Sequence, residues 1–441
     1  MSKYLIQGGL PLKGELTLPG AKNAVTKILI ASLLSPEPSQ LHNIPNIKEI
    51  DLTLRLLKSF GSDITKTASS GNTSTFESCR GTQFTNLIPD EEASHNRMAV
   101  LTIAPLLHVF GELKLPKGMG GDKIGPRPID FHLNAYRQLG AIVTEDETHY
   151  HISTSGLKGA NIELPYPSVS TTENILLAAS LAKGTTVIKN AAIEPEVIDL
   201  VLYLQKMGAI IELQPNRTLV IEGQKELKGV SHTILPDRIA CASYGVMSIA
   251  TGGEVEVLDA RQEHMLSFLN TLRRMNAPFQ VTDRGIVFGN GKRNKLEPIS
   301  LETDVHPGFM TDWQPPMVIL MTQASGLSTL HETVYENRLG FAHTLNDMGA
   351  NIQLSTRCLG GTPCRFHYRD FNHSCIINGP TQLTGTQVRV PDIRAGFTYV
   401  VAGLLAEGET EIDHIDEIER GYGQLDQHLL SLGAHIQRIQ S

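Results

Sequence analysis

Apolar residues recur along the chain with helical spacing, and each such run ends in the same way. One run is Val197, Leu200, Val201 and Leu204, and another is Met265, Phe268, Leu269 and Leu272. A short marker centred on Gly, or once on Asn, then precedes a β-rich run. The markers are Phe60-Gly61-Ser62, Leu139-Gly140-Ala141, Met207-Gly208-Ala209, Met275-Asn276-Ala277, Met348-Gly349-Ala350 and Leu432-Gly433-Ala434. Because Gly and Asn adopt the left-handed conformation that ends helices, each marker predicts a turn from helix to strand.

The markers lie roughly 70 to 85 residues apart, a period longer than that of short solenoid repeats. Each predicted helix also follows another apolar helical segment and a strand, as in 175–182 with 185–189 and in 400–406 with 409–413. This pattern predicts an α/β fold of six similar modules in two groups of three. The boundary is expected near Leu235-Pro236-Asp237, with residues 22–236 in one domain and 1–21 with 237–441 in the other. A ligand site is expected between the domains.

The charge balance restricts the classes of ligand. The chain has 441 residues, with 38 Lys and Arg against 46 Asp and Glu, and a net charge of −8. This balance argues against a nucleic-acid partner, because no basic surplus is available to neutralise phosphates. An anionic substrate would need a local cluster of Arg and Lys.

The N-terminal segment has no signal-peptide pattern, and the longest apolar runs, such as 100–110, are too short to span a membrane. Five scattered cysteines fit a reducing cytoplasm, where we expect the protein. Cys358, Cys364 and Cys375 lie close to His373 in sequence, but their spacing matches no paired Cys-x-x-Cys pattern. We therefore expect no metal, and in the absence of a dinucleotide fingerprint, no cofactor.

A loop rich in Gly and Pro occupies residues 115–130 and contains one isolated acid, Asp122, and one arginine, Arg127. Its four Gly and three Pro residues exclude a helix interior or a central strand and allow the backbone to approach a ligand closely. The alternative is a surface linker that binds nothing.

The turn before the second helix of each module often carries an arginine. The turns read Arg127-Pro-Ile-Asp130, Glu194-Pro-Glu196, Ala260-Arg-Gln262, Glu336-Asn-Arg338 and Glu419-Arg-Gly421. An Arg beside a helix N-terminus makes a good anion site, because the unpaired N–H groups there carry partial positive charge. The alternative for each is an exposed Arg–Glu pair that contributes little.

Taken together, several motifs resemble one enzyme family along the whole chain. The motifs are Pro19-Gly-Ala-Lys22-Asn23, His95-Asn-Arg97-Met98, Gly120-Gly-Asp122-Lys-Ile-Gly-Pro-Arg127-Pro-Ile-Asp130, Thr311-Asp312-Trp-Gln314, Glu336-Asn-Arg338, Asp392-Ile-Arg394 and Glu419-Arg420-Gly-Tyr422. This set closely resembles the UDP-N-acetylglucosamine 1-carboxyvinyltransferase (MurA) family of the EPSP synthase superfamily. The resemblance implies a two-domain inside-out α/β barrel of six βαβαββ repeats. It also implies phosphoenolpyruvate and UDP-N-acetylglucosamine as substrates, in the first committed step of peptidoglycan precursor synthesis.

The resemblance also implies roles for individual residues. Lys22, Arg127 and Arg420 would hold the phosphate of phosphoenolpyruvate, with Arg338 and Arg394 beside its carboxylate and Arg97 in the same cluster. Asp312 would be the base that accepts the proton of the sugar 3-hydroxyl, although Thr311-Asp312 before an apolar run also fits a helix N-cap. Asn23 would bind substrate near the reacting atoms. The nucleotide sugar would contact Arg127, Pro128, Ile129, Asp130, Phe131, Ser168, Val169, Ser170 and Val334.

Four features depart from the family pattern. Asp122 stands where most members have Cys, the loop is about three residues longer, Ala240 replaces a usual Glu, and Ser170 replaces a usual Gly. Asp122 is nevertheless a candidate catalytic residue, with Lys22 and Arg420, because a carboxylic acid can also transfer a proton. The Asp also implies insensitivity to fosfomycin, which alkylates the cysteine thiolate of the usual enzyme. The alternatives are a divergent enolpyruvyl transferase acting on another acceptor, the shikimate enzyme of the same fold, or a nucleotide-sugar-binding protein without activity.

Overall fold

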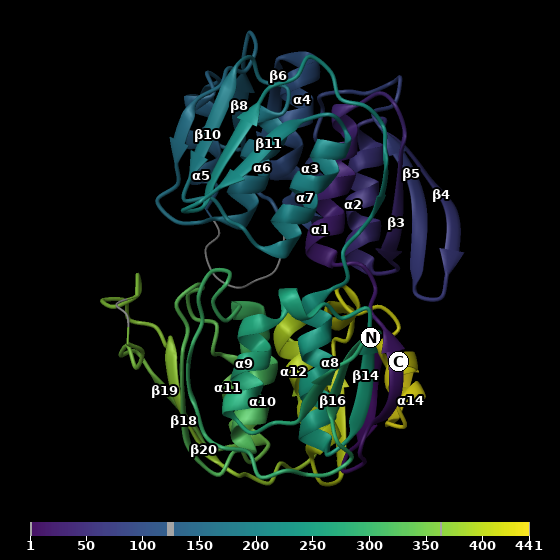
Figure 1. The fold of residues 1–441 in the computed structure, drawn as a ribbon, viewed down its shortest axis with the longest axis vertical. Helices are drawn as coiled ribbons and strands as arrows, with labels where there is room; N and C mark the ends of the chain where they lie inside the picture. The colour runs from purple at the N-terminus through teal and green to yellow at the C-terminus, as the bar shows by residue number, and fades with distance from the viewer. Residues whose placement is uncertain (1, 121–127, 362–363, 441) are drawn as a thin grey trace. The chain divides into compact units, whose positions relative to one another are not determined.

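The computed structural model describes residues 2–120, 128–361 and 364–440. The described chain divides into two compact units (Figure 1). Residues 2–18 and 236–440 form one, which we call the C-unit, and residues 19–120 and 128–235 form the other, the N-unit. Each unit has its own hydrophobic core, from Tyr4 to Ile436 in the C-unit and from Ala21 to Leu235 in the N-unit.

Three sheets form the outside of the N-unit among the described residues. The first has the order β13(Ser231–Thr233), β3(Ser39–Pro45), β5(Thr73–Cys79), β4(Asp63–Ser70). The second has β6(Glu112–Pro116), β8(His149–Ser153), β7(Ile142–Glu145), and the third has β11(Ile210–Gln214), β12(Thr218–Glu222), β10(Thr185–Lys189), β9(Asn161–Glu163). The helices are α1(Lys22–Ala31), η1(Ser32–Leu34), α2(Lys48–Ser59), α3(Asp90–His95), η2(Arg97–Thr102), α4(Ile103–Phe110), α5(Asp130–Gln138), α6(Val169–Ala179) and α7(Pro195–Lys206).

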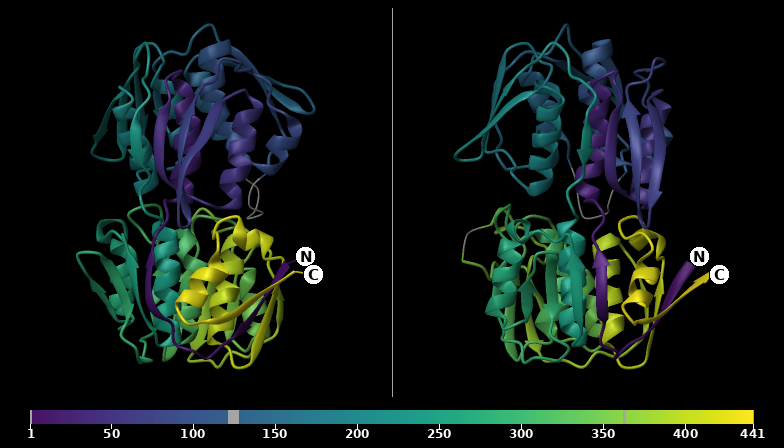
Figure 2. Two further views of the ribbon diagram at one scale, coloured as in Figure 1. Left: turned by 90° about the vertical axis from the view of Figure 1, so that its right-hand side faces the viewer. Right: turned by 45° about the vertical axis from the view of Figure 1, so that its right-hand side comes forward.

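Three sheets of the same layout form the outside of the described C-unit. Their orders are β15(Phe279–Val281), β16(Gly285–Gly289), β14(Glu254–Leu258), β2(Lys13–Thr17); then β17(Ser300–Glu302), β18(Gly326–His331), β20(Ser374–Gly379), β19(Ile352–Ser355); and β21(Gln387–Arg389), β22(Glu409–Asp413), β1(Ser2–Gln7), β23(His435–Gln440). The helices are α8(Arg238–Thr251), η3(Gln262–His264), α9(Leu266–Arg274), η4(Thr311–Trp313), α10(Gln314–Thr322), α11(Phe341–Asp347), α12(Ile393–Leu405), α13(Asp416–Glu419) and α14(Leu425–Ser431). The two chain ends lie side by side, because β1 pairs antiparallel with β23 (Figure 2).

The helices fall into two kinds that explain the inside-out arrangement. The first helix of a repeat is buried on all sides: every residue of α8 and of α10 is buried, and α8, α10 and α12 contact one another inside the C-unit (Figure 1). A helix that is apolar all round is stable only in such an interior. The second helix is amphipathic, as in α9, which buries Phe268, Leu269, Thr271 and Leu272 and exposes its other side.

The predicted helix ends are confirmed at every marker. Residues Gly61, Gly140, Gly208, Asn276, Gly349 and Gly433 all have positive φ, between 58° and 108°. Each follows the C-cap residue of the second helix of its repeat, as Gly208 follows Met207 at the end of α7. The amide of Ala209 then bonds back to the carbonyl of Leu204, which turns the chain into β11.

The α/β fold class and the inside-out architecture of repeated modules are confirmed, and the strands expected at 185–189 and 409–413 are β10 and β22. Residues 115 and 116 of the Gly/Pro loop belong to the edge strand β6, and Asp130 begins α5. Asp122 and Arg127 lie outside the described residues. Within the described chain, no helix is both long and apolar enough to cross a membrane.

The left-handed caps provide a stability prediction. Gly208→Ala should destabilise the protein by about 1–2 kcal/mol, because a Cβ there has open space around it but the φ of 108° is strained for an L-residue. Gly340→Ala is the matched control: its Cβ position is also open, but its φ of −58° suits Ala. Urea unfolding followed by circular dichroism measures both; equal stability of the two variants would contradict the assignment.

Candidate active site

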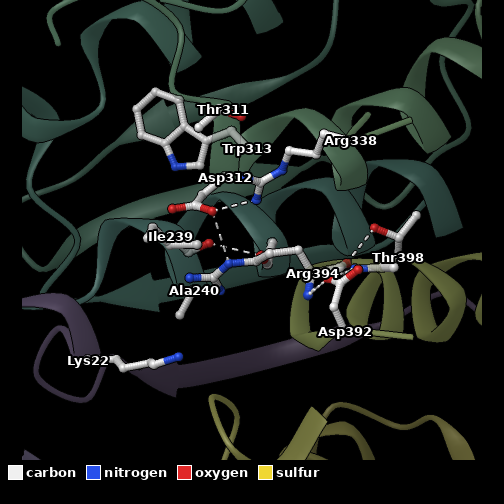
Figure 3. Close-up of polar contacts among 12 residues, drawn as sticks. Lys22, Ile239, Ala240, Thr311, Asp312, Trp313, Arg338, Asp392, Arg394 and Thr398 are labelled. Atoms are coloured by element: carbon white, nitrogen blue, oxygen red, sulfur yellow. Dashed lines mark hydrogen bonds and ion pairs between the residues drawn. The ribbon is translucent and has the colours of Figure 1, made fainter. Parts of the chain in front are cut away.

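Asp312 lies in the single turn η4, directly before α10, and its carboxylate contacts two arginines (Figure 3). Its Oδ1 accepts a hydrogen bond from Nη2 of Arg338 at 2.7 Å and one from Nε of Arg394 at 3.4 Å. The helix N-cap alternative is not supported, because among the described residues neither η4 nor α10 has a side-chain hydrogen bond at its N-cap. Asp312 is thus the centre of an ion-pair cluster.

Arg338 approaches Asp312 from the turn between β18 and α11, and its side chain is only 5% exposed. Burial lowers its pKa, but the negative charges of Asp312 and Glu332 outweigh that effect and raise it above the ordinary value. The guanidinium also lies 5.1 Å from the centre of the Tyr335 ring. Charge-assisted hydrogen bonds in such surroundings are stronger than those on the surface.

Arg394 approaches from the first turn of α12. Asp392 caps this helix by accepting the backbone amides of Arg394 and Ala395. Nη1 of Arg394 donates to the hydroxyl of Tyr422 at 3.0 Å. Burial raises the pKa of Tyr422, so the phenol stays neutral and serves as a fixed acceptor. Arg420, two residues before Tyr422 in the chain, forms a 3.1 Å ion pair with Glu417 in the same unit.

Glu332 supports this cluster from behind and was not predicted from the sequence. Its carboxylate is fully buried and accepts the hydroxyl of Thr311 at 2.9 Å and the amides of Val334 and Tyr335 at 2.8 and 3.1 Å. Burial raises its pKa, against the lowering effects of Arg338 and of these hydrogen bonds. Glu332 therefore ties the segment carrying Val334 and Arg338 to the turn carrying Asp312. The contact spans 21 residues of sequence, so no local motif signals it.

In the N-unit, Lys22 is the first residue of α1 and its side chain is 12% exposed. Its Nζ lies 3.9 Å from the carboxylate of Glu49. Asn23 follows, and its carbonyl oxygen accepts a hydrogen bond from Nζ of Lys27 at 2.7 Å. The ammonium of Lys27 also lies 3.9 Å from the carboxylate of the buried Glu173 in α6. This ion pair links α1 to α6.

The predicted nucleotide-sugar segments of the N-unit are brought together by His132, another residue missed from the sequence. Nδ1 of His132 accepts from the amide of Asn174 at 3.0 Å, so its Nε2 carries the proton and donates to Ser170 at 3.2 Å. This joins residues 128–131, at the start of α5, to residues 168–170, at the start of α6. Arg97 reaches the same region by donating to the carbonyl of Pro128 at 3.3 Å.

Several candidate residues of each unit lie at the N-terminus of a core helix, whereas Arg338 lies in the β18–α11 turn and Arg420 directly follows α13. In the C-unit, Asp312 precedes α10 and Arg394 opens α12, while Ala240 lies in the first turn of α8. In the N-unit, Lys22 opens α1, Arg97 opens η2, and residues 168–170 begin α6. Helix N-termini carry partial positive charge and free N–H groups, so both units present surroundings that favour anions. Val334 belongs to the C-unit, whereas the predicted nucleotide-sugar contacts at 128–131 and 168–170 belong to the N-unit.

Comparison with known proteins supports the resemblance. Residues 6–429 match the family model of EPSP synthase (3-phosphoshikimate 1-carboxyvinyltransferase). The chain belongs to the EPSP synthase family. It is 44% identical over 446 residues to UDP-N-acetylglucosamine 1-carboxyvinyltransferase of Protochlamydia amoebophila (strain UWE25), covering 100% of this chain and 95% of that protein. The protein of the same name from Chlamydia pneumoniae is 44% identical over 428 residues, covering 97% and 93%.

The fold is also that of a solved member of the enolpyruvyl transferases. The crystal structure of the enolpyruvyl transferase NikO from Streptomyces tendae superimposes with a TM-score of 0.86, covering 100% of this chain and 99% of that one. The two sequences are only 20% identical, so this likeness concerns the fold alone. The sequence relatives, and not this fold likeness, confirm the resemblance to UDP-N-acetylglucosamine 1-carboxyvinyltransferases.

The buried histidine gives a pH prediction. Burial and the nearby charge of Arg97 lower the pKa of His132 to about 3, against about 6.5 in an unfolded chain. Between pH 6.5 and pH 3 the imidazole of His132 takes up a proton only in the unfolded chain, which favours unfolding. The free energy of unfolding is therefore unaffected by protonation of this histidine above pH 6.5 and decreases as pH falls towards 3. His132→Gln, which does not titrate, should therefore lose less stability than the native chain between these values.

The slope expected from one proton is about 1.4 kcal/mol per pH unit. Urea unfolding at several pH values between 4 and 8 measures the difference. His435→Gln serves as the control, because His435 is an exposed residue of β23 in the other unit. A native chain and a His132→Gln variant with parallel pH profiles would contradict the buried neutral state.

Proposed function

We propose that this chain transfers the enolpyruvyl group of phosphoenolpyruvate to the 3-hydroxyl of UDP-N-acetylglucosamine with release of phosphate. This is the first committed step of peptidoglycan precursor synthesis, and we place it in the cytoplasm. The observation that carries the proposal is the Asp312 carboxylate held by Arg338 and Arg394, in a chain 44% identical to proteins of that name.

The reaction needs an acid, a base and dense positive charge. The 3-hydroxyl oxygen bonds to C2 of the enolpyruvyl group while its proton passes to Asp312, and C3 gains a proton from the carboxylic acid of Asp122. The Asp122 carboxylate then takes a proton from C3, which expels phosphate and restores the double bond. Both substrates are anions, so guanidinium and ammonium groups stabilise them best where water is excluded.

We assign the cations to parts of phosphoenolpyruvate. Lys22, Arg127 and Arg420 hold its phosphate, while Arg338 and Arg394 lie beside its carboxylate, with Arg97 completing the positive shell. A carboxylate that engages Arg338 and Arg394 competes with Asp312 for their N–H groups. Substrate binding thereby frees a lone pair of Asp312 to accept the hydroxyl proton, which links binding to catalysis.

We assign the nucleotide sugar to Asn23, residues 127–131, residues 168–170 and Val334. The hydrogen bond from His132 to Ser170 supports this, since it holds two of these segments together in the N-unit. In the C-unit, the backbone amide of Val334 donates a hydrogen bond to Glu332, which fixes the position of this predicted contact residue.

Acceptor-dependent phosphate release tests the function. The native chain should release phosphate from phosphoenolpyruvate with UDP-N-acetylglucosamine, and not with shikimate 3-phosphate or without acceptor. Asp312→Asn should lower kcat by at least about 100-fold, the usual effect of removing a general base. Asp283→Asn, an exposed carboxylate in the β15–β16 turn of the same unit, is the matched control and should keep full activity.

Each other outcome has a definite meaning. Release with shikimate 3-phosphate would assign the chain to the shikimate reaction. Binding of UDP-N-acetylglucosamine by calorimetry without turnover would favour a nucleotide-sugar-binding protein. Full activity of the Asp312→Asn variant, with unchanged thermal unfolding, would show that Asp312 is not the general base.

Fosfomycin resistance follows from the side chain at position 122. A carboxylate is a far weaker nucleophile towards an epoxide than a thiolate, so preincubation with fosfomycin should leave activity and intact mass unchanged. Asp122→Cys is the matched variant and should gain time-dependent inactivation with a covalent adduct. A fosfomycin adduct on Asp122 in the native chain would overturn this part of the proposal.

A further inference from the structure

Four potential metal ligands meet at one end of the β17–β18–β20–β19 sheet in the C-unit. His331 is the last residue of β18, and His373 directly precedes β20, which pairs with β18 so that His331 lies opposite Ser374. Cys358 and Cys364 lie in the segment that connects β19 to β20. One ligand atom from each of the four residues lies within 4.8 Å of the other three.

The distances among these atoms suit a single tetrahedral ion. Sγ of Cys358 lies 3.4 Å from Sγ of Cys364 and 3.4 Å from Nε2 of His373. Around a tetrahedral zinc, with Zn–S of about 2.3 Å and Zn–N of about 2.0 Å, neighbouring ligand atoms lie about 3.3–3.8 Å apart. The side chains are therefore arranged almost as zinc would hold them.

The two histidines are oriented and buried in the way that metal ligands are. His373 is fully buried, and its Nδ1 donates to the carbonyl of Phe371 at 3.1 Å, which leaves the lone pair on Nε2 towards Cys358. His331 is 1% exposed; its Nδ1 lies 3.6 Å from a carboxylate oxygen of Glu302, and among the described residues its Nε2 has no hydrogen-bond partner. Leaving a buried ring nitrogen without a hydrogen bond costs about 1–3 kcal/mol, which a metal bond would offset.

The surroundings provide an outer layer around these ligands. The carboxylate of Glu302 lies 3.6 Å from Nδ1 of His331 and accepts the backbone amide of Gly361. A carboxylate beside a ligating histidine commonly fixes its orientation. The ring of Phe366, 2% exposed, packs against the His373 ring with centroids 6.2 Å apart. Nδ1 of His367 lies 3.3 Å from Sγ of Cys358, so His367 is the alternative to His331 as the fourth metal ligand.

We propose that His331, Cys358, Cys364 and His373 bind one zinc ion. Two thiols and two imidazoles are a ligand set typical of zinc, and four protein ligands leave no open position, so the site is structural. Binding releases the two thiol protons, and the ion holds the 356–373 segment against the end of β18. This site goes beyond the proposed activity and does not depend on it.

The spacing of Cys358, Cys364, Cys375 and His373 predicts no metal, so the proposed zinc site departs from that expectation. Cys358, Cys364 and His373 take part, but Cys375 does not: it is fully buried within β20, and His331, more than twenty residues earlier in the chain, takes its place. The zinc site is also connected to the candidate active site. Arg365, in the zinc-binding segment, donates a hydrogen bond to the carbonyl of Val334.

Metal content tests the proposal directly. The full chain, produced without a polyhistidine tag and dialysed against metal-free buffer with a reductant, should retain one zinc ion per chain by elemental mass spectrometry. Cys358→Ser and Cys364→Ser should each lose it. Cys375→Ala, a change to a nearby cysteine outside the cluster, should retain it, and circular dichroism establishes that each variant is folded.

Cobalt substitution gives a second readout that does not depend on the variants. The native chain loaded with Co²⁺ should show the intense visible bands of a tetrahedral site and a thiolate charge-transfer band in the near ultraviolet, and Cys364→Ser should lack the latter. His367→Ala should leave both unchanged. A native chain that binds neither zinc nor cobalt after incubation with excess metal and gel filtration would overturn the proposal, as would a Cys358–Cys364 disulfide under reducing conditions.

Discussion

The carboxylate of Asp312 between the guanidinium groups of Arg338 and Arg394 is the interaction on which the C-unit's chemistry depends. The two arginines come from different repeats and would repel each other if the anion were absent. Because all three side chains are largely shielded from water, their charges interact strongly and their geometry is fixed. The anionic substrate that we propose for this cluster would meet positive charge that is already assembled, so little reorganisation would be needed when charge develops in the reaction.

The inside-out fold explains why such a cluster can form. Each repeat contributes one core helix whose sides are buried in the unit. Only the N-terminal end of such a helix can present polar groups to a ligand. Lys22, Arg97, Ser168, Asp312 and Arg394 all lie at such starts, in five different repeats. Buried polar side chains then fix the turns: Glu332 holds the turn of Asp312, and His132 holds the starts of α5 and α6. Both act inside a low-dielectric core, where an unsatisfied polar group would be costly.

The sequence predicted the features that depend on local physics. Helix ends at Gly208 and Asn276, the strand at 185–189 and the six-fold recurrence are local, because cap conformation and hydrophobic period are properties of neighbouring residues. The sequence could not predict Glu332, His132 or His331, because their roles come from contacts between segments far apart in the chain. Asp312 shows the same limit: its local sequence fits a helix cap, and only its contacts with Arg338 and Arg394, 26 and 82 residues later, reveal an ion-pair cluster.

We propose Asp312, held by two arginines, as the base for the sugar 3-hydroxyl. A crystal structure of the chain with UDP-N-acetylglucosamine bound would test this role. We expect the 3-hydroxyl oxygen to lie within about 2.6–3.2 Å of the Asp312 carboxylate, the reach of a general base. A bound nucleotide sugar whose 3-hydroxyl lies beside another acid, with Asp312 contacting only Arg338 and Arg394, would contradict it.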